Sequence, residues 1–177
     1  GPFHHYVFEF YALDAKLEAF YTTSLEWHAF KGRTDMQHVD AWFDMKVQQA
    51  VRDTVKCMDE TMFRSALQRG FFDLQHAMKW YLKRTKKNPN RDVMKRAIET
   101  QVLLLAPFAP HICEEIWKKI GKEDFVSLAR LPDIAEKPVD PELDAAESLI
   151  VNVLDDVRRV LSLAKVNKPK QITFFVA

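Results

Sequence analysis

Apolar residues recur at three- and four-residue spacing along most of the 177-residue chain, which is the period of an amphipathic α-helix. The most regular stripe comprises Phe63, Ala66, Leu67, Gly70, Phe71, Leu74, Met78 and Tyr81. Glycine, on which Gly-rich turns and phosphate-binding loops depend, occurs only four times. The pattern therefore predicts an all-α fold, a helical bundle of about five to six helices.

Turn and capping residues divide this pattern into segments. We expect helices over about residues 13–30, 40–58, 63–81, 92–105, 110–120 and 141–164. Gly32 is interpreted as the stop of the first helix, Asp40 as the N-cap of the second, and Asp140-Pro141 as the start of the last. Gly70 costs its helix about 1 kcal/mol relative to alanine, so we expect a close helix crossing there.

The two ends of the chain are expected to lie outside the bundle. Gly1-Pro2 resembles the scar of a cleaved purification tag, and residues 1–11 are a lead-in whose aromatic sequence fits a helix or a strand. Residues 12–165 then form the bundle. Residues 166–177 are interpreted as a linker and the start of a C-terminal domain, because residues 171–177 read as a short β-strand.

Composition limits the classes of function. The formal net charge is +1, so any surface for nucleic acid must arise from local clustering of cations. No apolar run approaches the ~20 residues that span a bilayer. The two cysteines, Cys57 and Cys113, lie in apolar helical patterns and are expected to be reduced core thiols. These features favour a cytoplasmic protein.

The stretch LLLAPFAPHICEEIW, residues 103–117, first raises the question of a chemical site. His111 and Glu115 are four residues apart and would share a helix face, as a metal-binding pair does. No further cluster of ligands follows at a usual spacing, so the sequence predicts no metal site. A small metal-dependent hydrolase that uses this pair remains the last-ranked alternative.

The structural interpretation of the same stretch is a joint between two helices. The residue before Pro107 disfavours the α conformation, so one helix ends there, and Pro110 suits the first turn of the next. Phe108 is expected to fill the core at the bend. The predicted joint residues are Pro107, Phe108, Pro110, His111 and Trp117.

These motifs carry a family resemblance. The pattern Leu-Leu-x-Pro-Phe-x-Pro-His followed by Glu-Glu-Ile-Trp resembles the helical, anticodon-binding-type domain of class I aminoacyl-tRNA synthetases. The segment FRSALQRGFFDLQ, residues 63–75, and the run between residues 153 and 174 resemble leucyl-tRNA synthetases of the archaeal and eukaryotic type. The same domain of a valyl or isoleucyl enzyme is the alternative, although valyl enzymes are expected to carry glutamate where this chain has Lys83.

The resemblance implies a part of an enzyme that is not itself catalytic. The His-Ile-Gly-His-like and Lys-Met-Ser-Lys-Ser-like signatures of the class are absent from this sequence. The parent leucine--tRNA ligase would use ATP and Mg²⁺ to activate leucine and attach it to tRNA(Leu), whereas this chain would need no cofactor. The implied partners are tRNA and the catalytic and C-terminal domains of the parent, with no membrane and no DNA. The family does not generally read the leucine anticodon, so the expectation for this bundle is docking on the tRNA backbone.

Cations that could contact RNA phosphates are concentrated in one stretch. Residues 79–96 contain eight basic side chains and a single acid, Asp92. The predicted tRNA-binding residues are Lys83, Arg84, Lys86, Lys87, Arg91, Lys95 and Arg96, with Lys46 and Arg52 of the second helix as a further set. The alternative for these residues is a solvated helix connection. The alternative for the whole chain is a free-standing helical module that binds a protein partner through exposed Phe and Trp side chains.

Overall fold

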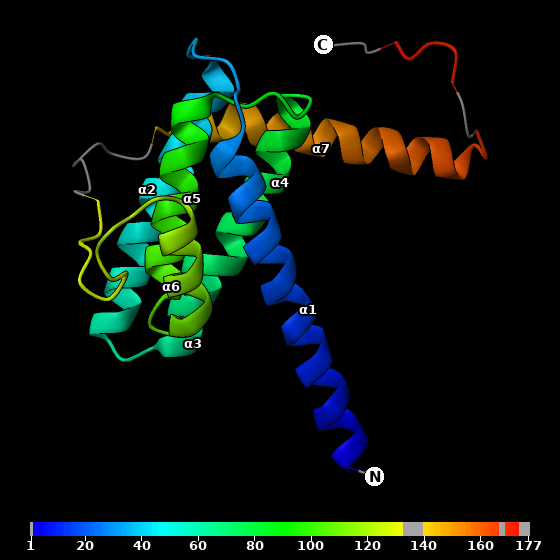
Figure 1. Ribbon diagram of the computed structural model, residues 1–177. Helices are drawn as coiled ribbons and strands as arrows, with labels where there is room; N and C mark the ends of the chain where they lie inside the picture. Colours follow the sequence, from blue (N-terminus) through cyan, green and yellow to red (C-terminus); the bar gives the residue numbers. More distant parts are fainter. Residues whose placement is uncertain (1, 133–139, 167–168, 174–177) are drawn as a thin grey trace. The chain divides into compact units, whose positions relative to one another are not determined.

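The structure, a computed structural model, describes residues 2–132, 140–166 and 169–173, with residues 2–14 described as backbone only (Figure 1). Its helices are α1 (Pro2–Ala29), α2 (His38–Asp59), α3 (Phe63–Leu67), the π-helical η1 (Gln68–Asp73), α4 (Leu74–Arg84), α5 (Arg91–Leu105), α6 (Pro110–Lys119) and α7 (Pro141–Leu163). The described residues form no strand, and the predicted all-α fold is confirmed. The chain divides into two compact units, residues 1–138 and 139–177.

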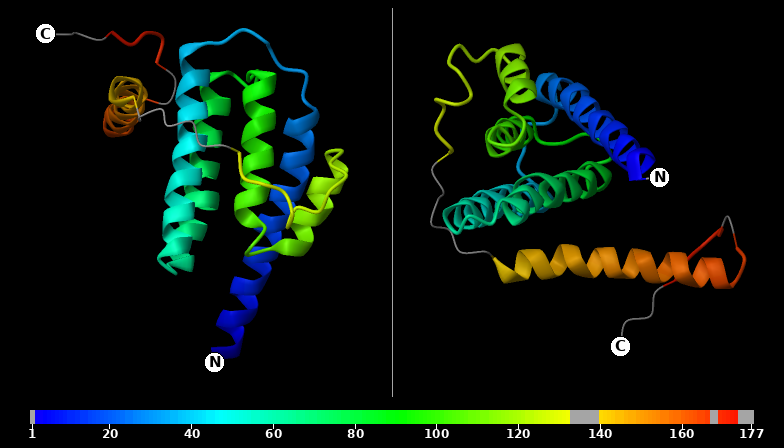
Figure 2. Two further views of the ribbon diagram at one scale, coloured as in Figure 1. Left: turned by 90° about the vertical axis from the view of Figure 1, so that its left-hand side faces the viewer. Right: turned by 90° about the horizontal axis from the view of Figure 1, so that it is seen from below.

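Within the first unit, α5 lies at the centre. It contacts α2 on one side and α1 and α6 on the other, and α2 forms a hairpin with α3, η1 and α4 (Figure 2). The Phe43 and Tyr81 rings stack at 4.4 Å between the two arms of this hairpin. The largest fully buried apolar side chains include these two, Leu74, Met94, Ile98 and Ile116. Burial of this apolar surface, at about 25 cal/mol per Å², is the main stabilising contribution to the bundle.

The third predicted helix is continuous but not uniform. It runs through α3, η1 and α4, and its predicted stripe is buried except for Phe63, which is 55% exposed, and Leu67, which is half-buried. The wider π-helical turn of η1 lets the adjacent Gly70 and Phe71 both face the core. A Cβ atom on Gly70 would lie 2.8 Å from Thr54 Oγ1 and 3.2 Å from Leu104 Cβ, which confirms the predicted close crossing.

Two predictions at the start of the bundle are wrong. Helix α1 ends at Ala29, and Gly32 serves a close contact, because a Cβ atom there would lie 2.1 Å from the Pro89 carbonyl oxygen. Asp40 is not the N-cap of α2, which is Gln37. Asp40 lies in the first turn of α2, fully buried, where its carboxylate accepts a hydrogen bond from the Gln37 N–H at 2.7 Å. Long-range partners, described below, outweigh the local preference of aspartate for a cap.

The predicted joint between two helices is confirmed with two corrections. Ala106, the residue before Pro107, keeps the α conformation with φ −52° and ψ −38°, so the predicted avoidance of that conformation is wrong. Helix α5 ends at Leu105 and α6 begins with Pro110 in its first turn. The Phe108 N–H donates to the Leu105 carbonyl at 2.9 Å, and Phe108 is only half-buried, so it does not fill the core as expected. Trp117 is buried and takes that role, whereas His111 is exposed to solvent.

The second unit consists of α7 and the residues that follow it. Asp140 caps α7 as predicted, since its carboxylate accepts from the N–H groups of Glu142 and Leu143 at 3.0 and 3.2 Å. Residues 171–173, the described part of the predicted terminal strand, are not in a strand, and residues 174–177 lie outside the described residues.

Two smaller expectations concern membranes and cysteines. In the part of the chain that the structure describes, no helix is both long and apolar enough to span a membrane. Both cysteines are free thiols. Cys113 is fully buried, and this burial raises the pKa of its thiol to about 12, while Cys57 is half-buried. The Cys113 thiol is therefore a protonated core group, as the sequence predicts. Cys57 lies only partly in the core.

Candidate nucleic-acid interface

The predicted cations lie around the connection between α4 and α5, here called the basic turn, residues 83–91. Lys83 and Arg84 occupy the last turn of α4, and Lys86 and Lys87 lie in the connection itself. Arg91, Lys95 and Arg96 lie in the first turns of α5. Lys83, Lys86, Lys87, Arg91 and Arg96 are exposed, and Arg84 and Lys95 are half-buried. The structure thus places the first predicted set at one helix–turn–helix end.

The backbone of the basic turn is a helix C-cap in which lysine stands where glycine is usual. The Lys86 N–H donates to the Lys83 carbonyl at 3.2 Å and the Lys87 N–H to the Leu82 carbonyl at 2.8 Å, which is the Schellman pattern. Both residues have left-handed backbone, with φ of 51° for Lys86 and 60° for Lys87. That conformation costs an L-residue roughly 1–2 kcal/mol. Thr61 and Lys165 have a positive φ after two other helices, so this backbone is a recurring helix ending in the chain and does not by itself indicate a function.

The cations of this end differ in how they are paired. Arg96 forms an ion pair with Asp44 of α2 at 2.9 Å, and Arg91 pairs with its neighbour Asp92 at 3.1 Å. The Lys83 ammonium lies 5.5 Å from the centre of the Trp80 ring. Among residues 15–132 and the other segments whose side chains the structure describes, no carboxylate forms an ion pair with Lys86, Lys87 or Lys95. The lysines at the tip of the turn are therefore available to an anionic ligand.

A buried polar network holds the base of the turn. It consists of Arg33, Asp40, Tyr81 and Asn90. The Arg33 guanidinium donates to both carboxylate oxygens of Asp40, at 2.9 and 2.7 Å, and the Tyr81 hydroxyl donates to the same carboxylate. The backbone N–H of Asn90, at the end of the turn, donates to the Tyr81 hydroxyl oxygen at 2.9 Å. Every member is buried or half-buried, so the network is well screened from water.

The protonation states follow from these bonds. Burial opposes ionisation of Asp40, but hydrogen bonds from Arg33, Tyr81 and the Gln37 N–H outweigh it and hold the pKa of Asp40 below its usual value. Burial, and donation to the Asp40 carboxylate, raise the pKa of Tyr81 far above that of a free tyrosine. Asp40 is thus a buried carboxylate paired with a cation, and Tyr81 remains a donor at neutral pH.

The network also ties the basic turn to the distant connection between α1 and α2. Arg33 and Asn90 form an isolated parallel β-bridge, in which the Arg33 N–H donates to Pro89 and the Arg91 N–H donates to Arg33, at 3.2 and 2.9 Å. The Asn90 side chain donates to the Asp35 carbonyl at 2.9 Å. Sequence reasoning missed this connection, because it took Gly32 for a helix stop, whereas Gly32 allows the close contact with Pro89.

The second predicted set is not brought to this end. Lys46 is half-buried with its ammonium 5.8 Å from the Trp42 ring, and Arg52 is half-buried further along α2. Arg52 follows Asp40 by 12 residues, which is about 18 Å along a helix that rises 1.5 Å per residue. The structure therefore separates Arg52 from the basic turn.

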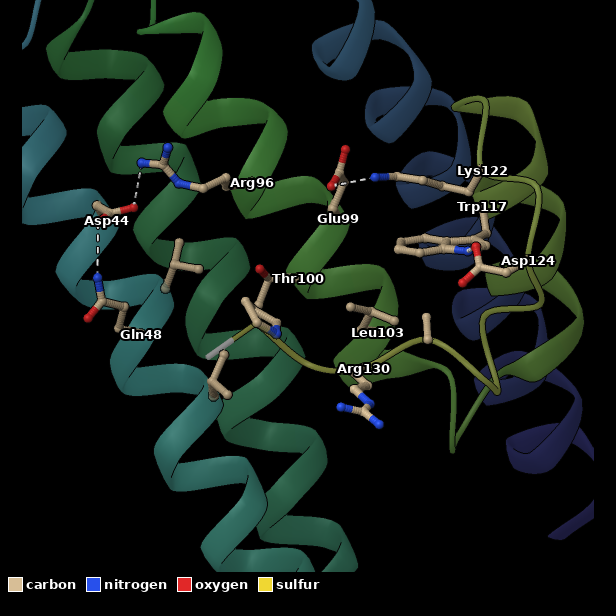
Figure 3. A pocket seen from close by; sticks show the side chains of 14 residues that line it. Asp44, Gln48, Arg96, Glu99, Thr100, Leu103, Trp117, Lys122, Asp124 and Arg130 are labelled. Atoms are coloured by element: carbon tan, nitrogen blue, oxygen red, sulfur yellow. Dashed lines mark hydrogen bonds and ion pairs between the residues drawn. The ribbon is translucent and has the colours of Figure 1, made fainter. Parts of the chain in front are cut away.

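The first unit also contains a pocket of about 480 Å³ between α2, α5, α6 and the segment that follows α6 (Figure 3). Its charged lining comprises the cations Arg96, Lys122 and Arg130 and the carboxylates Asp44, Glu99 and Asp124. Lys122 and His28 approach Glu99 at 2.8 and 3.0 Å. Burial opposes ionisation of Glu99, but these two hydrogen bonds outweigh it and lower its pKa. Because the lining charges balance, the pocket is a poor site for phosphate.

The alternative of a metal site finds no support in the geometry. Among the described residues, no group of three or more His, Cys, Asp or Glu side chains is placed to hold a metal ion. Glu115 accepts a hydrogen bond from the Tyr21 hydroxyl at 3.0 Å, and His111 is exposed. The hydrogen bond between Tyr21 and Glu115 joins α1 to α6.

Comparisons with known proteins agree with the resemblance found in the sequence. The chain is 40% identical over 131 residues to the leucine--tRNA ligase of Aeropyrum pernix, and 31% identical over 170 residues to that of Pyrococcus horikoshii. These matches cover 74% and 93% of this chain, but only 14% and 18% of the relatives. The chain thus spans less than a fifth of the length of the curated relatives it matches. The predicted similarity to archaeal-type leucyl-tRNA synthetases is confirmed.

A solved structure shares the fold. A leucyl-tRNA synthetase of Agrobacterium radiobacter K84, solved as a ternary complex with tRNA and LeuAMS, matches with a TM-score of 0.59 and 22% identity. The match covers 73% of this chain and 17% of that one. Residues 40–174, most of the chain, match the family model described as the anticodon-binding domain of tRNA ligase. The chain therefore belongs to the family of anticodon-binding domains of tRNA ligases.

Proposed function

We propose that this chain is the tRNA-docking helical part of an archaeal-type leucine--tRNA ligase. Family membership and the leucine--tRNA ligases among its relatives support the proposal. The longer protein would act in the cytoplasm and use ATP and Mg²⁺ to activate leucine, through parts that lie outside this sequence. The chain itself would bind tRNA, and it would catalyse no step.

The observation that carries the docking role is the basic turn. Lys86 and Lys87 are exposed, have no ion-pair partner among the described residues, and sit in a strained backbone that the buried polar network stabilises. Mobile ammonium groups on a rigid backbone suit the phosphates of an A-form helix, whose bases a side chain cannot read from the deep major groove. We therefore propose docking on the tRNA backbone with no base readout.

The test is binding of the 177-residue chain to two transcripts, a leucine tRNA and a valine tRNA, across a salt series. Backbone docking predicts a linear fall of log K with log salt for both, because each neutralised phosphate releases counterions. The double variant Lys86→Glu/Lys87→Glu should weaken binding of both transcripts and flatten this slope by about one per lost contact.

A matched control is available on another helix. Lys118 and Lys119 are exposed lysines in the last turn of α6. The variant Lys118→Glu/Lys119→Glu changes the net charge by the same amount at a different place. If it lowers affinity and slope as much as the Lys86/Lys87 variant does, the interaction is a general charge effect. If neither transcript binds at about 50 mM salt, where phosphate contacts are strong, the docking proposal is wrong.

A contact with other parts of the longer ligase is a second candidate role. Phe125 and Leu128, in the segment after α6, are 67% and 74% exposed. Two large apolar side chains this exposed and three residues apart are typical of a surface that another domain covers. We propose the catalytic or C-terminal domain of the ligase as that partner. Phe125→Ser/Leu128→Ser should leave tRNA binding by the chain unchanged and lower the thermal stability of the longer protein.

A further inference from the structure

We infer that the connection between α1 and α2, residues 30–37, is part of the same docking edge as the basic turn. Lys31 would be an additional phosphate contact, and Arg33, Tyr81 and Asn90 would be positioning residues that hold the two segments in register. This inference rests on the proposed tRNA docking. It adds a segment whose last residue, 37, comes 46 residues before the first residue of the basic turn, 83.

The two segments are in direct backbone contact. Arg33 exchanges backbone hydrogen bonds with Pro89 and Arg91, as described above, and its side-chain Nε donates to the Asn88 carbonyl at 2.9 Å. Gly32 packs against the Pro89 carbonyl with no room for a Cβ atom. Lys31 is the residue before Gly32, and its side chain is exposed. Its charge is therefore presented beside the end of the basic turn.

Lys31 has the same electrostatic character as the lysines of the turn. Among the described residues it forms no ion pair, and the nearest acid in its own connection, Asp35, is held by Arg33 at 3.4 Å. Three unpaired lysines, Lys31, Lys86 and Lys87, thus flank one backbone bridge. An extended polyanion that contacts one segment of this edge would also meet the other.

The buried polar network explains why the edge is rigid. Asp40 is wholly buried, and its hydrogen-bond donors are Arg33 and the Gln37 N–H in the connection and the Tyr81 hydroxyl in α4. The Asn90 side chain reaches back to the Asp35 carbonyl, and its oxygen caps α5 by accepting from the Asp92 and Val93 N–H groups. Contacts fixed before binding need no ordering when RNA arrives, which improves affinity.

The first arm of the test concerns Lys31. We would measure binding of a leucine tRNA transcript, over a salt series, to Lys31→Glu, Lys87→Glu and the control Lys119→Glu. The inference predicts that Lys31→Glu and Lys87→Glu each lower the salt slope by about one, and that Lys119→Glu leaves it unchanged. If Lys87→Glu lowers the slope and Lys31→Glu does not, the connection lies outside the docking edge and only this inference fails. If neither variant changes the slope, the proposed docking function itself fails.

The second arm concerns positioning. Tyr81→Phe removes the acceptor of the Asn90 N–H and the donor to Asp40 while keeping the ring stacked on Phe43. We expect the Asn90 amide to exchange its hydrogen faster, and the Kd for tRNA to rise about 2- to 10-fold at an unchanged salt slope. In a Lys87→Glu background the same change should have a smaller effect, because the positioned contact is already lost.

A gentler variant guards against a general loss of the fold. Asn90→Ser keeps a capping oxygen for α5, since serine and asparagine cap equally well, but it cannot reach the Asp35 carbonyl. It should therefore raise Kd while the helical circular dichroism of the chain stays unchanged. If Tyr81→Phe and Asn90→Ser leave Kd unchanged, or act equally with and without Lys87→Glu, the positioning role is wrong.

Discussion

Helix α5 is joined to its neighbours by two short connections of different construction. The basic turn before it contains Pro89, and the joint after it contains Pro107. The basic turn combines local helix-capping hydrogen bonds with distant partners, since Asn90 bonds to Tyr81 and Asp35. The joint is held locally, by proline restriction and by hydrogen bonds from the N–H groups of Phe108 and Ala109 to the Leu105 carbonyl.

The difference shows what each connection is for. A bend between two helices needs only local restriction, because proline fixes its own φ and has no N–H to continue a helix. The basic turn instead holds Lys86 and Lys87 in an unfavourable backbone region, and such strain persists only where the surroundings over-determine the conformation. Hydrogen bonds to the Lys83 and Leu82 carbonyls fix these two residues, and the buried ion pair and Tyr81 hold Asn90 at the end of the turn. We infer that the joint shapes the bundle and that the turn presents charge.

The largest expected effect comes from removing the centre of the network. Asp40→Ala removes the buried partner of the half-buried Arg33 guanidinium and leaves it only the longer, exposed pair with Asp35; losing one partner of a buried pair typically costs about 3–5 kcal/mol of unfolding free energy. Urea denaturation would measure the loss. The control is Asp59→Ala at the exposed end of α2, which should change stability by no more than about 0.5 kcal/mol. A loss below about 1 kcal/mol for Asp40→Ala would show that the turn and the joint are held equally locally.

The next effect is on acid stability. The network lowers the pKa of Asp40 in the folded chain, so its contribution is complete above the unfolded-state pKa of about 3.9 and is lost as pH falls below it. Asp40→Asn should therefore flatten the dependence of the urea midpoint on pH below about 4. Glu99, whose pKa is also lowered, should contribute to the pH dependence that remains in Asp40→Asn, and Glu99→Gln should remove that contribution. An unchanged acid profile in Asp40→Asn would contradict the network's role.

A smaller effect, with opposite signs in two assays, is expected at the tip of the turn. Lys86→Gly relieves a left-handed backbone and should stabilise the fold by about 0.5–1 kcal/mol, while it weakens tRNA binding by removing a cation. The reciprocal change at the end of α6, Gly121→Ala at φ 88°, should destabilise by a similar amount and leave tRNA binding unchanged. If Lys86→Gly loses stability, the left-handed lysine is not strained.

The smallest effect is expected at the joint. Pro110 occupies the first turn of α6, where its ring fits and its missing N–H has no consequence. Pro110→Ala should lower stability by only about 0.4–1 kcal/mol, through greater freedom of the unfolded chain, and tRNA affinity should not change. Thermal unfolding and the same salt series would measure both. A change in tRNA affinity would show that the joint also contributes to the interface.

The sequence predicted the helices and the position of the cations well, because both depend on local signals. The period of the apolar stripe, Asp140 and the two prolines of the joint are read within one or two turns of chain. Asp40 was misread as a cap because aspartate near a helix start usually is one. Its actual partners, Arg33 and Tyr81, lie 7 and 41 residues away, and the second is beyond any local pattern. The left-handed lysines were missed although their capping hydrogen bonds are local, because glycine is the usual residue at such positions and this turn has none.

The π-helical segment η1 has a consequence for comparing this chain with its relatives. A π-turn contains one residue more than the α-turn it replaces, so it equals a single-residue insertion within a continuous helix. Each inserted residue rotates the following face by about 100°. A relative with a plain α-helix here would align with a one-residue gap, and the gap would mark a genuine difference of shape. Homologous positions in α4, including the equivalent of Tyr81, should be assigned only after that gap is placed.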